Sequence, residues 1–295
     1  MNVFKKMMAV ALAGVLAVGA LAGCNNSEST NDTNGGDTTT ATGKDIYVVV
    51  REDGSGTRGA FDELIGVEEP TEKAETATST SLVQTTVAGN EAAIGYISLG
   101  ALDETSVKAV KVDGVEASVE NIKSGAYSVA RPFVVCYKEE NLTDLGRDFV
   151  SFIMSTDGQQ ILSDNGYIAD PENADPYSAS GLTGKLSLNG STSVAPVMEK
   201  IAEAYKALNA DVTIDVQQTG SGSGIEATID GSCEIGMSSR DLKDEELAEG
   251  LTPVTIAMDG IAVIVNPANT VEDLTVDQIR SIFTGETTNW GDLAK

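Results

Sequence analysis

The sequence of 295 residues contains no histidine. Histidine is the usual general base near neutral pH and the usual partner of a serine or cysteine nucleophile. Its absence excludes Ser-His-Asp and Cys-His catalysis, and with them any zinc site that depends on histidine ligands. Hydrolytic enzymes of those kinds are therefore ruled out.

Basic residues are scarce as well. Lys and Arg total 19 against 45 Asp and Glu, which gives a formal net charge of −26. Nucleic acids and anionic bilayer surfaces are recognised through clustered positive charge, so neither is expected as a partner. If the ligand is an anion, it must be held by local groups that outweigh a distant, screened net charge.

Cysteine is rare, with three in the chain. Cys136 and Cys233 lie in apolar, strand-like runs, which favours two buried thiols and leaves a disulfide open as an alternative. Cys24 ends an N-terminal segment in which Lys5 and Lys6 precede a long apolar run and small residues. This pattern predicts an export signal over residues 1–24.

The end of that segment, LAGC, resembles the lipobox of bacterial lipoproteins, in which the cysteine is acylated and becomes the mature N-terminus. The resemblance implies lipidation at Cys24 and a place on the extracytoplasmic face of the bacterial cell membrane, and an uncleaved anchor is the alternative. Residues 25–44 are polar and predict a flexible tether.

After the tether, short β-branched runs alternate with amphipathic segments, the pattern of an α/β fold. Helices are predicted over residues 144–164 and 194–208, and the second carries apolar residues at three- and four-residue spacing. Residues 170–184 combine Pro, Gly, Ser and acidic residues, which predicts an exposed linker between two halves of the chain.

Three turns share one design, in which a strand is followed by Ser, Thr and Gly residues and then by a helix. They are Val50–Arg58, Leu188–Val194 and Thr219–Ile225. The first N–H groups of a helix lack intrahelical partners, and the helix dipole makes that end partly positive. Each turn can therefore hold an oxyanion, although Ser, Thr and Gly are also ordinary capping and turn residues.

The first turn adds charged groups. Arg51 can grip an oxyanion bidentately, and Asp53 can orient that guanidinium or accept a proton from phosphate, which sulfate does not carry. The alternative interpretation is that Arg51 and Asp53 form a surface ion pair in the turn. The turns lack the Gly-Lys-Ser/Thr ending of nucleotide-binding loops, and Asp244–Glu246 is typical of a solvated helix start, so neither nucleotide nor metal is expected.

These motifs resemble the substrate-binding proteins of ABC-type phosphate importers, the PstS type with a periplasmic-binding-protein-like fold. The resemblance implies two α/β lobes, capture of inorganic phosphate, delivery to ABC permease subunits, and neither a cofactor nor catalysis. Ser239 stands where some members carry an Asp that accepts the phosphate proton. The phosphate contacts that the resemblance implies are Arg51, Asp53, Ser55, Gly56, Thr57, Thr192, Ser193 and Ser221, with Ser239.

The order of the segments is exchanged relative to that family. Residues like 184–293 come first there and residues like 44–168 second, which predicts a circular permutation in which residues 170–184 join the family's usual ends. One lobe is then expected from residues 45–129 with 259–295, and the other from 130–258. A fragment of a longer protein, whose halves need a partner chain, is the alternative.

Three other functions stay open at this point. The ligand could be another oxyanion, such as sulfate or molybdate, and the protein could sense phosphate as a lipoprotein without transporting it. An enzyme would need Ser55 or Ser193 as a nucleophile, for which the sequence offers no histidine base.

Overall fold

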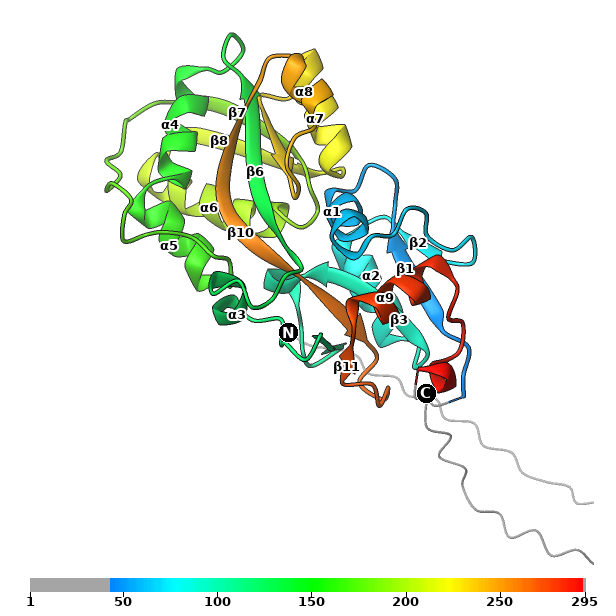
Figure 1. The fold of residues 1–295 in the computed structure, drawn as a ribbon. Coiled ribbons are helices and arrows are strands. Elements are labelled where there is room, and N and C mark those ends of the chain that lie inside the picture. Colours follow the sequence, from blue (N-terminus) through cyan, green and yellow to red (C-terminus); the bar gives the residue numbers. More distant parts are fainter. Residues whose placement is uncertain (1–42, 294–295) are drawn as a thin grey trace, which may run out of the picture. The chain divides into compact units, whose positions relative to one another are not determined.

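One mixed sheet organises the chain in the computed structural model, which describes residues 43–293 (Figure 1). Within these residues nine strands run in the order β2-β1-β3-β10-β6-β9-β7-β8, with β4 beside β10. The predicted signal segment, Cys24 and nearly all of the predicted tether lie outside the described residues. Among the described residues, no helix has the length and apolar character needed to cross a bilayer.

Parallel strands form both ends of the sheet, and antiparallel strands form its middle. β1 pairs in parallel with β2 and β3, and β7 pairs in parallel with β8 and β9. β10 is antiparallel to β3 and to β6. The strands are β1 Tyr47–Arg51, β2 Glu75–Ala77, β3 Ala93–Ser98, β4 Lys108–Ala109, β5 Lys111–Val112, β6 Ala130–Lys138, β7 Gly184–Gly190, β8 Val212–Gln218, β9 Ile235–Ser238, β10 Leu251–Val265 and β11 Asp273–Leu274.

Helices follow most of the strands, as the alternating pattern predicts. They are α1 Gly56–Ile65, α2 Thr80–Ala88, α3 Val119–Lys123, α4 Asp144–Ile153, α5 Thr156–Asp164, α6 Ala195–Leu208, α7 Ser221–Asp230, α8 Asp244–Ala248 and α9 Val276–Thr284, with short 3-10 turns at Leu99–Ala101 and Trp290–Asp292. The single helix expected over 144–164 is wrong. Ser155 accepts a hydrogen bond from Gly158 N as the N-cap of α5, and this cap starts a second helix.

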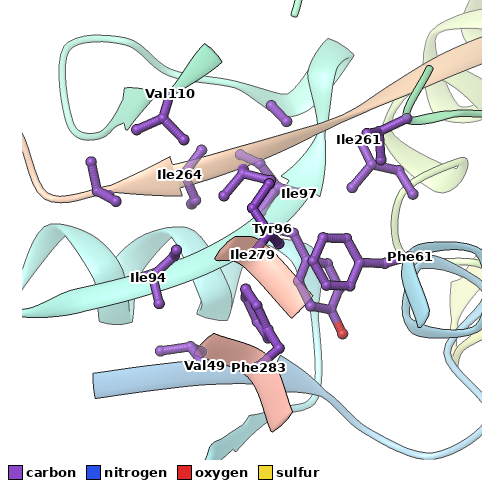
Figure 2. Packing of buried hydrophobic residues seen from close by; sticks show 14 of the residues in the cluster. Val49, Phe61, Ile94, Tyr96, Ile97, Val110, Ile261, Ile264, Ile279 and Phe283 are labelled. Carbon is purple, nitrogen blue, oxygen red and sulfur yellow. The ribbon is translucent and has the colours of Figure 1, made fainter. Parts of the chain in front are cut away.

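Buried apolar residues gather in two main clusters, and each defines a lobe. The first lobe packs α1, α2 and α9 around β1, β3 and the end of β10. Its centre is aromatic: the rings of Phe61 and Tyr96 stack at 3.9 Å, and Phe283 meets Phe61 edge-on at 4.9 Å (Figure 2). Such ring pairs stabilise the core beyond the area they bury.

The second lobe packs α4, α5 and α6 against one face of β6, β7 and β9. Its aromatic centre includes Phe149 and Tyr205, whose rings meet edge-on at 5.2 Å. Alternate residues of β6 serve opposite faces, because Phe133 lies in this core and Val134 lies in a smaller cluster beneath α7. The chain therefore has the predicted fold class, a two-lobed α/β fold.

Two strands run from one lobe to the other. β10 has Ile256 in the second core and Ile261 in the first, and β6 lies antiparallel to it (Figure 1). The register between them shifts between Thr255 and Ala257, a local irregularity of the kind that bends a strand. We call β6 and β10 the connecting strands.

Candidate functional site

Four helices present hydroxyl groups at their N-termini, and each helix directly follows a strand. Ser55 caps α1 by accepting a hydrogen bond from Arg58 N, and Thr80 opens α2. Thr192 and Ser193 precede α6, and Ser221 opens α7. All of these side chains are buried. Buried hydroxyls need hydrogen-bond partners, so the partners of these side chains define the site.

Hydroxyls from the two lobes meet directly. Thr57 Oγ1 of α1 lies 3.0 Å from Ser193 Oγ, and Thr80 Oγ1 of α2 lies 2.9 Å from the same oxygen. Thr80 Oγ1 is also 3.2 Å from Thr192 Oγ1. Residues more than a hundred positions apart in the sequence thus form one hydrogen-bonded cluster, which we call the hydroxyl cluster.

A second contact between the lobes lies beside it. Within the second lobe, Ser221 Oγ is 3.4 Å from Ser239 Oγ and accepts a hydrogen bond of 3.2 Å from Ser239 N, and the first lobe meets this pair at Gly56. Gly56 faces both side chains so closely that a Cβ atom there would overlap Ser221 Oγ and stand 2.8 Å from Ser239 Oγ. Gly56 therefore lets the lobes approach this closely, because any larger residue there must displace these side chains or separate the lobes.

Arg51 ends β1 and is only 1% exposed. Its Nη1 donates to Thr80 Oγ1 at 3.3 Å, which joins the guanidinium to the hydroxyl cluster. Its Nε and Nη2 donate to the two carboxylate oxygens of Glu52 at 2.8 and 2.7 Å. A bidentate pair of this kind fixes the plane of the guanidinium.

The pairing expected between Arg51 and Asp53 is wrong, because Glu52 takes that place. The side chain of Asp53 is 95% exposed and accepts a hydrogen bond of 2.6 Å from Arg58 Nη1. Arg58 lies in the first turn of α1 and also reaches Asp62, so it draws Asp53 outward. A direct role for Asp53 in ligand binding stays a prediction.

The structure brings together eight of the nine residues that the sequence analysis named as ligand contacts, and it leaves Asp53 at the edge. It adds Thr80 and Glu52, which the sequence analysis did not name. Part of the signal for Thr80 is visible in the sequence, because Ser79, Thr80 and Ser81 open a helix as the hydroxyl residues of the other three turns do.

A cavity of about 530 Å³ opens between the two lobes next to this site. Ser55, Arg58 and Arg131 line it from the first lobe and the connecting strands, and Arg240 lines it from the second lobe. Asp62 lies at the same place, and burial raises its pKa to about 6 although Arg58 opposes the shift. No group of three or more metal-ligating side chains is found within residues 43–293.

The site is chemically a cluster of hydrogen-bond donors at the N-terminal ends of four helices. Backbone N–H groups of four helix N-termini, neutral hydroxyls and one guanidinium converge, and Arg51 engages both oxygens of the neighbouring carboxylate. Such groups stabilise an oxyanion through hydrogen bonds and helix dipoles without a nearby metal. The fold and the site define a two-lobed binding protein for a small oxyanion.

Comparison with known proteins agrees with this class. A family model described as PBP superfamily domain matches residues 3–157 and 175–295. The chain is 44% identical over the full length of both chains to the phosphate-binding protein PstS 2 of Streptococcus agalactiae. A crystal structure of a phosphate-binding protein of a phosphate ABC transporter from Streptococcus pneumoniae matches with a TM-score of 0.68 and 43% identity, over 85% of this chain and 100% of that one.

The chain belongs to the PBP superfamily. The alignment with the phosphate-binding protein PstS of Bacillus subtilis covers less of the sequence, with 34% identity over 38% of each chain.

Proposed function

We propose that this protein captures inorganic phosphate outside the cytoplasm and delivers it to an ABC-type importer, without making or breaking a bond. The observation that carries the proposal is the hydroxyl cluster, in which Thr57 and Thr80 of one lobe meet Ser193 of the other beside the buried Arg51. Relatives of this chain that align over its full length are named as phosphate-binding proteins, which supports the choice of phosphate.

The ligand contacts are proposed on the same ground. The oxygens of a phosphate between the lobes would accept hydrogen bonds from Thr57, Thr192, Ser193, Ser221 and Ser239, which otherwise bond to one another or to Thr80. At the start of α1, Gly56 would contribute its backbone N–H group and Ser55 its hydroxyl, because Ser55 N already donates to Glu52 O at 3.2 Å, and Thr80 is added to the set. Arg51 would supply the positive charge, and Asp53 would act from the rim through Arg58.

An anion held in this way suits a protein with a net charge of −26. Donors that are already oriented in a buried site cost little reorganisation, and they act at short range, whereas salt screens the distant negative charge of the rest of the protein. Closing of the two lobes about the connecting strands would bury the ligand, and opening would release it to permease subunits. Acylation of Cys24 would keep the protein at the membrane.

We further propose that the segments stand in circularly permuted order relative to other PstS-type proteins. Residues 45–129 with 259–295 would form one lobe and residues 130–258 the other. A collinear alignment can match only one of two exchanged segments, and the match to the Bacillus subtilis protein covers 38% of each chain. The Streptococcus agalactiae relative aligns over its full length, so it shares the order seen here.

Equilibrium dialysis of radiolabelled phosphate against the full chain tests the proposed function, with sulfate as the competitor. Phosphate is expected to be retained and displaced by unlabelled phosphate at far lower concentration than by sulfate. Equal displacement by sulfate would favour a general oxyanion carrier, and no retention would contradict the proposal. Arg147→Lys, an exposed substitution on α4, serves as the control variant.

A further inference from the structure

The connecting strands hold a buried ion pair between the lobes. Arg131 of β6 lies directly opposite Asp259 of β10 in the ladder, and the two are 2% and 0% exposed. Arg131 Nε and Nη2 both donate to Asp259 Oδ2, at 3.2 and 3.1 Å. Ser98 Oγ donates to the other carboxylate oxygen at 3.0 Å. The carboxylate is therefore fully engaged.

The guanidinium group of Arg131, in contrast, has one nitrogen without a hydrogen-bond partner. Arg131 Nη1 is one of three buried side-chain nitrogen or oxygen atoms that have no hydrogen-bond partner among the described residues, and it belongs to a charged group. Leaving a charged donor unpaired in a protein interior is costly, so native structures rarely keep one without a use. The unpaired atom points to a partner that is not part of the chain.

The surroundings of Arg131 identify that partner by charge. Arg131 lines the same cavity as Ser55, the N-cap of α1. Burial is the main cause that lowers the pKa of Arg131, Asp259 acts against this shift, and the positive charge of Arg51 lowers the pKa further, so the two guanidinium charges repel each other. An anion placed between them removes this repulsion and pairs with the free donor.

The other polar side chains around the two arginines already have partners on the chain. The hydroxyls of Thr57 and Thr80 are already bonded to Ser193, and the carboxylates nearest to the two arginines, Glu52 and Asp259, are bonded to them. Arg58 and Arg240, which also line the cavity, pair with Asp53 and Glu246. Among the residues that line this cavity, Arg131 is the one whose side chain holds a buried nitrogen or oxygen atom, Nη1, without a partner among residues 43–293.

We propose that Arg131 is a second ligand-binding arginine, whose Nη1 donates to the bound oxyanion opposite Arg51. The proposal rests on the proposed function, since it assigns a further contact to the same site. It also gives the connecting strands a role in sensing the ligand. Arg131 is on β6, and its ion pair with Asp259 ties it to β10. An anion bound to Arg131 Nη1 therefore favours one arrangement of β6 and β10 over another.

The test is phosphate affinity by calorimetry on the full chain, with unfolding temperature measured in parallel without phosphate. Arg131→Lys keeps the charge beside Asp259 but lacks the second donor arm, and we expect it to weaken phosphate binding at least about tenfold. The double variant Arg131→Gln with Asp259→Asn removes both charges and is expected to weaken binding further while avoiding an unpaired carboxylate. Arg147→Lys should change neither quantity.

The outcomes separate this inference from the proposed function. If the wild-type chain binds no phosphate, both fail. If it binds phosphate and both Arg131 variants bind equally well, with only their unfolding temperatures lowered, Arg131 is structural and this inference alone fails. A crystal structure of the unaltered chain with phosphate decides the matter even if the variants do not fold. Nη1 within hydrogen-bond distance of a phosphate oxygen supports the inference, and a longer separation overturns it.

Discussion

Thr80 Oγ1 lies 2.9 Å from Ser193 Oγ although 113 residues separate them in the sequence. The contact joins the first turn of α2 in one lobe to the turn before α6 in the other. It is the shortest hydroxyl contact in the hydroxyl cluster, and Arg51 Nη1 donates to the same threonine. The site therefore exists only when both lobes fold and meet.

Thr80→Val tests the contribution of this hydroxyl, because valine has nearly the shape of threonine but cannot donate. A hydrogen bond to a charged ligand contributes roughly 1.5–3 kcal/mol, so phosphate affinity should fall about 10- to 150-fold. Calorimetry measures the phosphate affinity of the variant and of the wild type. Thr85→Val, on an exposed position of the same helix whose hydroxyl bonds to Ser81 O, should leave affinity unchanged. Equal affinity of the two variants would remove Thr80 from the site.

Arg51→Lys tests the guanidinium. Lysine keeps the charge but cannot bond to Glu52 with two parallel donors and reach Thr80 at once. We expect phosphate affinity to fall by roughly two orders of magnitude, with a smaller effect on the unfolding temperature. Binding that survives this change within a factor of two would show that a point charge is enough.

Gly56→Ala tests the approach of the two lobes. The added methyl overlaps Ser221 Oγ in the closed arrangement, so phosphate affinity should fall at least about tenfold. Gly59→Ala on the same helix is the matched control, because its Cβ would meet Arg240 Cδ at an ordinary 3.5 Å. Alanine favours a helix over glycine at both positions. A variant at Gly56 that binds as tightly as the control would contradict the contact.

Asp62 makes stability depend on pH. Burial raises its pKa in the folded state to about 6, from an ordinary value of 3.8. Between these values the folded protein binds more protons than the unfolded chain, so the contribution of Asp62 to stability is present at low pH and is lost as the pH rises through about 6. Asp62→Asn should remove this decline and stabilise the protein at pH 7 by on the order of 1–3 kcal/mol.

Urea unfolding from pH 4 to pH 8, without phosphate, measures this effect. Parallel curves for the variant and the wild type across that range would show that the carboxyl is not perturbed. The stability gained by Asp62→Asn is limited by the loss of the ion pair with Arg58, whose Nε lies 3.3 Å from the Asp62 carboxylate.

The sequence predicts the parts of this site that follow local rules. Helix caps are local, so Ser55, Ser193 and Ser221 could be placed at helix starts from their neighbours alone. Thr80 was not identified as a site residue from the sequence, because β2 before it has three residues, Glu-Thr-Ala, and is too short and too polar to recognise as a strand. Only its pairing with β1 makes it one.

Tertiary contacts account for the other differences. The partner of Arg51 depends on which acidic side chain turns inward at the end of β1, and Arg58 decides this from the next helix. β10 begins at Leu251 although its first part contains Pro253 and Asp259 and gives little local strand signal, because pairing with β6 holds that part in the sheet. The unpaired Nη1 of Arg131 has no sequence signal at all.

A calorimetric titration of the full chain with inorganic phosphate tests the central claim most directly. The account predicts saturable binding at one site per chain, which is lost or strongly weakened in Arg51→Lys and retained in Arg147→Lys. Absence of binding, or binding that requires two chains for each phosphate, would contradict a site assembled from both lobes of one molecule.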